Sequence, residues 1–220
     1  MRRLFAAIFC TALSAGAFAA SAPMSPEVAG IAHRWAKITY QTPGGEQEAA
    51  FKALADDAAR LAAGAPDAAQ PKVWEAIVLA SYAKANGGLG ALSAVKQARD
   101  LLLAAEKIDP DTLNGSVYTS LGSLYAKVPG WPIGFGSKDK ARGYLETALA
   151  KNPNGIDANY FYGDLLADQG EYAKAAEHLR RALEAPPRPG REDADAGRRA
   201  EARALLDTLH NRHPEQVAAQ

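Results

Sequence analysis

The chain has 220 residues, with 25 basic and 25 acidic side chains. This balance argues against a nucleic-acid surface or an anionic-membrane surface, because either would need a clustered excess of lysine and arginine. The single cysteine, Cys10, lies in an apolar segment without the small preceding pair that a lipoprotein site requires. Neither disulfides nor thiolate chemistry is therefore expected.

Residues 1–22 have the pattern of a secretory signal peptide. Arg2 and Arg3 precede an apolar run over 4–20, and two Ala-x-Ala motifs close it. A run of about 17 residues is short for a spanning helix, which needs roughly 20, so an uncleaved membrane anchor is the alternative interpretation. The pattern predicts export to the periplasm. Cleavage would remove Arg2 and Arg3, leaving 23 of the 25 basic residues against 25 acidic ones.

Residues 23–70 are predicted to form a degenerate helical hairpin. Ser25 followed by Pro26 is typical of a helix start. Apolar side chains at helical spacing then mark one face of each helix: Val28, Ile31, Ala32 and Trp35 in the first, and Phe51, Leu54, Ala58 and Leu61 in the second.

Residues 71–190 contain three internal repeats. The segment 81–84, Ser-Tyr-Ala-Lys, recurs 43 residues later as Leu-Tyr-Ala-Lys at 124–127, and the second half of the unit returns after a further 34 residues. A repeat of this length is typical of one helical hairpin per unit. Proline cannot extend a helix, so the second helix of each unit is expected to stop before Pro110, Pro153 and Pro187.

Small and large residues alternate along these predicted hairpins. Gly122 and Gly163 are expected where the two helices of a hairpin approach closely, and large side chains fill the space between hairpins. The last unit has, in order, Gly163, Leu166, Gly170, Tyr172, Ala175, Leu179, Ala182 and Pro187.

This order of residues resembles the tetratricopeptide repeat. The unit at 115–155 also matches it apart from a seven-residue insertion, and the unit at 72–112 has an insertion and Leu79 where a small residue is expected. The resemblance implies an all-α, right-handed solenoid of helical hairpins whose first helices line a concave groove. A capping helix over 192–210, within the C-terminal segment 191–220, would complete it.

A narrower resemblance concerns the whole architecture. An exported helical-repeat array with a proline- and glycine-rich insertion is similar to the periplasmic T components of TRAP-type transporters. That resemblance implies a soluble accessory of a solute-uptake system, which docks a solute-binding protein or a small ligand.

The insertion at 128–136 (Val-Pro-Gly-Trp-Pro-Ile-Gly-Phe-Gly) is the least ordinary segment. Its prolines and glycines exclude regular helix, yet Trp131, Ile133 and Phe135 are costly to leave in water. Two interpretations are open. Either the segment folds back and buries these side chains on its own repeat, which we favour because exposed apolar patches are rare, or Trp131 and Phe135 form a lip that contacts a ligand. The equivalent insertion at 86–91 has no aromatic residue.

The resemblance also predicts which side chains line the groove. They are Lys84, Thr119, Ser123, Lys127, Asp157, Tyr160, Asp164 and Asp168. Lys84 and Lys127 occupy the same position in successive repeats and could bind a carboxylate of a partner. The alternative is that both are solvated lysines that stabilise helix ends.

No catalytic or metal-binding pattern is evident in the sequence. His210 and His213 have a spacing that can share a metal on a helix, but no third ligand lies near them, and a solvated helix end is the favoured interpretation. The alternating charges around Arg198 are expected to form a solvated helix face. We therefore expect no enzyme activity, no cofactor and no metal.

The sequence thus predicts an exported scaffold that binds a protein or peptide partner through its concave groove. An association with a membrane complex would come through that partner. The transport accessory is the alternative, and it would enclose a pocket with a few convergent polar groups.

Overall fold

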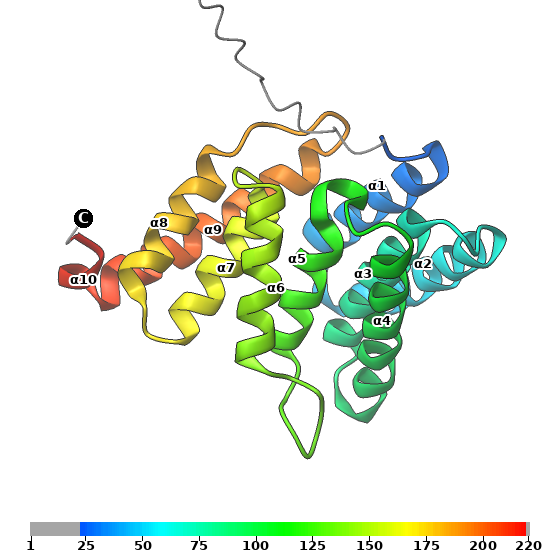
Figure 1. The fold of residues 1–220 in the computed structure, drawn as a ribbon, viewed down its shortest axis with the longest axis horizontal. Helices are drawn as coiled ribbons and strands as arrows, with labels where there is room; N and C mark the ends of the chain where they lie inside the picture. The colour runs from blue at the N-terminus through cyan, green and yellow to red at the C-terminus, as the bar shows by residue number, and fades with distance from the viewer. Residues whose placement is uncertain (1–22, 219–220) are drawn as a thin grey trace, which may run out of the picture.

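The computed structural model describes residues 23–218, so the predicted signal peptide at 1–22 lies outside the described residues. The described residues form ten α-helices (Figure 1). They are α1 (Pro26–Gln41), α2 (Gly44–Gly64), α3 (Ala69–Asn86), α4 (Gly88–Ile108), α5 (Thr112–Lys127), α6 (Lys138–Lys151), α7 (Ile156–Asp168), α8 (Tyr172–Glu184), α9 (Glu192–Arg212) and α10 (Pro214–Ala218).

The first eight helices pair as four consecutive hairpins: α1 with α2, α3 with α4, α5 with α6, and α7 with α8. The first helix of each hairpin also contacts the first helix of the next, so that α1, α3, α5 and α7 lie in succession. The helix α9 continues this series by packing on α7 and α8 (Figure 1). The predicted all-α solenoid of helical hairpins is confirmed.

Glycine at two positions allows the hairpins to close. A Cβ atom on Gly122 would lie 2.5 Å from Leu145 Cγ, and one on Gly163 would lie 3.0 Å from Leu179 Cγ. Both distances are shorter than van der Waals contact, so a side chain at either position would force the helices apart. This confirms the sequence register in the last two hairpins.

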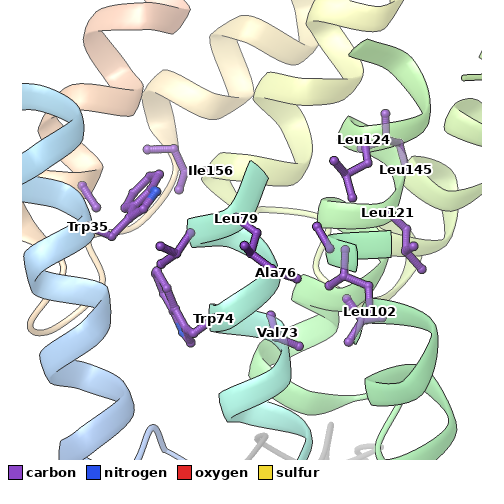
Figure 2. Packing of buried hydrophobic residues seen from close by; sticks show 14 of the residues in the cluster. Trp35, Val73, Trp74, Ala76, Leu79, Leu102, Leu121, Leu124, Leu145 and Ile156 are labelled. Carbon is purple, nitrogen blue, oxygen red and sulfur yellow. The ribbon is translucent and has the colours of Figure 1, made fainter. Parts of the chain in front are cut away.

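The core runs continuously through the stack. Leu102, Leu121, Leu145 and Leu179 are at most 1% exposed. At the N-terminal end, Trp35 of α1 and Trp74 of α3 meet edge to face with ring centroids 6.0 Å apart. Figure 2 shows these two rings between α1 and α3, with Ile156 of α7 beside Trp35 and the leucines of α4 to α6 on the far side of α3.

The helix ends follow the local chemistry that the sequence predicts. The Ser25 hydroxyl accepts a hydrogen bond from the Val28 amide at the start of α1, and Pro26 occupies its first turn. Gly170, with φ of +80°, separates α7 from α8. One expectation is wrong: the segment 86–91 forms no inserted loop, because α4 begins at Gly88.

Candidate functional site

The segment 128–136 leaves α5 and returns to α6 as an ordered loop. The Gly136 amide donates to the Pro129 carbonyl at 2.9 Å, and the Gly134 amide donates to the Gly130 carbonyl at 3.1 Å. At its base, Phe135 packs edge to face on Tyr125 with centroids 5.3 Å apart. The loop is therefore fixed by its own backbone and by one aromatic anchor.

The tip of this loop projects into solvent. Trp131 is 90% exposed and Ile133 is 63% exposed, and Figure 1 shows the loop extending beyond the ends of α5 and α6. The favoured folded-back interpretation is therefore right for Phe135 and wrong for Trp131 and Ile133.

A second candidate surface lies on the last two turns of the first helices. We call it the polar strip and define it as Lys84 of α3, Ser123 and Lys127 of α5, and Asp164 and Asp168 of α7. All five residues come from helices that contact one another in succession.

Within the polar strip, Lys127 is held by carboxylates of the next repeat. Its Nζ lies 2.6 Å from Asp164 Oδ2 and 3.5 Å from Asp168 Oδ2. Lys138, at the start of α6, adds a contact of 3.0 Å to Asp168. Partial burial lowers the pKa of Lys127, but Asp164 and Asp168 outweigh it and leave that pKa above its ordinary value. The charges of this group cancel.

Lys84 differs from Lys127 although both occupy the same repeat position. Lys84 is exposed, and it forms no ion pair among the described residues. The repeat register explains the difference. When Gly122 is aligned with Gly163, Ser123 and Lys127 of α5 take the places that Asp164 and Asp168 take in α7. Lys84 therefore lacks the acidic neighbours that neutralise Lys127.

Two of the residues predicted to line the groove are covered, and a third, Asp157, is held by two arginines. Thr119 is buried, with only 9% of its surface exposed. Tyr160 lies under Arg198 of α9, whose Cζ is 4.6 Å from the ring centroid. Burial raises the pKa of Tyr160 to about 12. Neither side chain is freely available to a partner.

Arg198 belongs to a buried ionic cluster and does not form the solvated face that we expected. It is 7% exposed, and its Nε lies 2.8 Å from Asp157 Oδ1. Arg188 of the linker before α9 approaches the other oxygen of Asp157 at 2.8 Å, and also contacts Asp195. Burial would raise the pKa of Asp157, but Arg188 and Arg198 outweigh it and hold this pKa well below its ordinary value.

The same cluster connects the first helix of the solenoid, α1, with α9 near its other end. Glu201 of α9 pairs with Arg198 and accepts a hydrogen bond from the Tyr40 hydroxyl of α1 at 3.4 Å. Gly197 allows this contact, because a Cβ atom there would lie 2.4 Å from the Tyr40 ring. The helices α1 and α9 therefore touch, and the start of the solenoid meets its end.

The histidines take part in local packing. His213 stacks on Tyr172 with centroids 3.6 Å apart, and His210 Nδ1 lies 3.0 Å from the Leu206 carbonyl. His178 is half-buried beside Asn159. Within residues 23–218, no group of three or more metal-ligating side chains comes together.

Hollows of the described surface include two that lie elsewhere. The larger, of about 560 Å³, lies over α3 and α4 and is lined by Lys72, Ser93 and Gln97 among others. The smaller, of about 220 Å³, lies between α1 and the start of α9 beside His33 and Arg191. Neither contains a residue of the polar strip or of the loop tip.

Several contributing residues were not predicted from the sequence. Lys138 was missed although Ser137, a typical helix N-cap, places it in the first turn of α6. Arg99 was missed because its position over the Phe135 ring, 4.7 Å from the centroid, depends on how the loop folds onto α4. No local pattern indicates that contact.

Comparison with known families supports the fold. Stacked helical hairpins with glycine at the closest helix contacts define a helical-repeat solenoid. Residues 134–189, which include α6, α7 and α8, match the family model for the tetratricopeptide repeat. Residues 134–189 are therefore similar to the tetratricopeptide repeat, and the all-helical hairpins of the other described residues are consistent with the same kind of repeat. A search of curated proteins found no match to it.

Proposed function

We propose that this protein is a non-enzymatic scaffold that binds a protein partner along the polar strip. Tetratricopeptide repeats generally mediate interactions between proteins, which supports a protein partner. The finer assignment depends on one observation, namely that Lys84 is exposed and forms no ion pair with any described residue, at a position where Lys127 holds two carboxylates.

The chemistry of Lys84 suggests what the partner contributes. By the repeat register, the nearest strip residues on α5 are a hydroxyl and a second cation, Ser123 and Lys127. A carboxylate of the partner would pair with Lys84 as Asp164 and Asp168 pair with Lys127 one repeat later. Charge-assisted hydrogen bonds of this kind are stronger than neutral ones, and they also fix orientation.

Quantitative capture of partners from a periplasmic extract tests this proposal. Lys84→Glu reverses the charge on the strip, and Lys52→Glu makes the same change at an exposed position on the second helix α2. A partner that depends on the strip should be retained by the wild type and by Lys52→Glu. Lys84→Glu should retain about tenfold less of it, since a charged hydrogen bond contributes about 1.5–3 kcal/mol. Equal capture by all three proteins would contradict the proposal.

Export to the periplasm is part of the same proposal. The pattern of residues 1–22 supports it, and mass spectrometry of the periplasmic protein should find a chain that begins at Ala20 or Pro23. Among residues 23–218, none of the helices has the length and apolar character needed to cross a membrane. An intact Met1 would instead support the uncleaved anchor.

The captured partner also decides between the scaffold and the transport accessory. If a solute-binding protein is the partner that depends on Lys84, the scaffold serves a solute-uptake system. If another protein is captured, the accessory role is excluded while the scaffold role stands.

A further inference from the structure

The loop at 128–136 carries an apolar tip that the polar strip does not use. From Val128 to Ser137 the sequence has no charged residue. Trp131 and Ile133 lie on this tip together with exposed Pro129 and Pro132. Leaving such side chains in water is unfavourable, and exposed apolar patches often mark contacts with other molecules or with membranes.

The backbone of the tip is already ordered in the free protein. Backbone hydrogen bonds close the loop at two levels, between Gly136 and Pro129 and between Gly134 and Gly130. The Ser137 amide also donates to the Tyr125 carbonyl at 2.9 Å. Because the backbone is held, inserting the tip into another phase requires little additional ordering.

Three cations and three carboxylates flank the base of the loop. Arg99 lies over the Phe135 ring, and Lys140 Nζ is 5.4 Å from the centroid of the Tyr125 ring. Lys138 is also exposed here. Nearby carboxylates are Asp100, which pairs with Arg99, Asp168, which pairs with Lys138, and the exposed Asp139. The two charged groups that contact the aromatic base itself are both cations.

We propose that this tip inserts into the interfacial region of a lipid bilayer that contains anionic lipid. Tryptophan prefers the boundary between headgroups and acyl chains, where its ring is buried and its N–H stays hydrated. The cations at the base would then lie at the level of the headgroup phosphates. The balanced charge of the chain argues against a membrane contact made by charge alone, and here Trp131 and Ile133 provide the main attraction.

A bilayer fits this tip better than a protein pocket does. The loop extends beyond the helix ends (Figure 1). A protein partner would need a matched pocket for Trp131, whereas a bilayer adapts to a small apolar protrusion. Membrane contact at the tip goes beyond the proposed scaffold role.

Tryptophan fluorescence can follow the insertion directly. The chain has three tryptophans, of which Trp35 and Trp74 are 8% and 3% exposed, so a change on binding reports on Trp131. The protein beginning at Pro23 is mixed with vesicles of phosphatidylethanolamine and phosphatidylglycerol. We expect co-sedimentation with the vesicles and a shift of the emission to shorter wavelength. The double variant Trp131→Ser, Ile133→Ser should lose about tenfold or more of the vesicle binding.

Ile108→Ser is the matched control, because Ile108 is 41% exposed and lies at the end of α4, outside the loop. It should bind vesicles as the wild type does, and all variants should keep the wild-type melting temperature. The proposal is overturned if the wild type neither sediments nor shifts its emission, or if the double variant binds as well as Ile108→Ser. It is also overturned if the wild type does not bind vesicles and the double variant no longer captures a protein that the wild type captures. The tip would then be a contact site for a protein.

Discussion

At the scale of single residues, Gly163 provides the sharpest test of the repeat register. A side chain there would meet Leu179 Cγ at 3.0 Å and the Ala175 carbonyl oxygen at 3.1 Å. Gly163→Leu should therefore lower the free energy of unfolding by about 1–3 kcal/mol through overpacking. Gly143→Leu is the control, because no atom lies within 4 Å of its Cβ position. Thermal melts that show equal losses would contradict the register.

Asp157 provides a test that depends on pH. Its carboxylate is held by Arg188 and Arg198, and its pKa is lowered. A lowered pKa stabilises the fold above the unfolded pKa of about 3.9, and this stabilisation is lost as the pH falls toward the folded value. Asp157→Asn should cost about 3 kcal/mol at neutral pH, because the buried Arg198 and the half-buried Arg188 lose the carboxylate that they share and keep only Glu201 and Asp195.

Urea titrations of the wild type and Asp157→Asn at several pH values measure this effect. The stability difference between the two proteins should be constant from neutral pH down to about pH 5 and should shrink below about pH 4. A difference that does not change over this range would show that the carboxylate charge is not the stabilising feature.

At the scale of elements, the structure separates Trp131 of the loop from Trp74 of α3 by role. Trp131 is exposed and Trp74 is buried. Trp131→Ala should change the stability by less than about 0.5 kcal/mol, as surface substitutions do. Trp74→Ala should cost about 3–5 kcal/mol, as deletions of core aromatic residues do. Chemical denaturation of the two variants measures both values, and a large loss for Trp131→Ala would mean that the loop packs down.

The helical hairpins were predictable because their signals are local. Gly163, Leu179 and Pro187 occur at fixed spacing, and each acts within one hairpin or between two neighbouring ones. The loop tip was not predictable, because hydrophobicity alone favours burial of Trp131. Whether it is buried depends on backbone hydrogen bonds that turn the tip outward, such as that between Gly136 and Pro129.

At the scale of the whole molecule, the contact between α1 and α9 could not be predicted from the sequence pattern. Tyr40 and Glu201 are separated by 161 residues, and their contact depends on the summed twist of all the hairpins between them. The sequence therefore gave no reason to expect that Arg198 is buried. The candidate site was partly predictable: Lys84 and Lys127 are exposed, whereas Asp164 is only 16% exposed against Lys127 and both Thr119 and Tyr160 are covered.

The central claim is that a protein partner binds along the polar strip of the first helices. Hydrogen–deuterium exchange of the protein, with and without the partner whose capture depends on Lys84, tests it most directly. We predict slower exchange over residues 79–86, 119–127 and 160–168, at the ends of α3, α5 and α7. Exchange over 52–60 in α2 and 141–149 in α6 should not change. Protection confined to these second helices, with none on the strip, would contradict the claim.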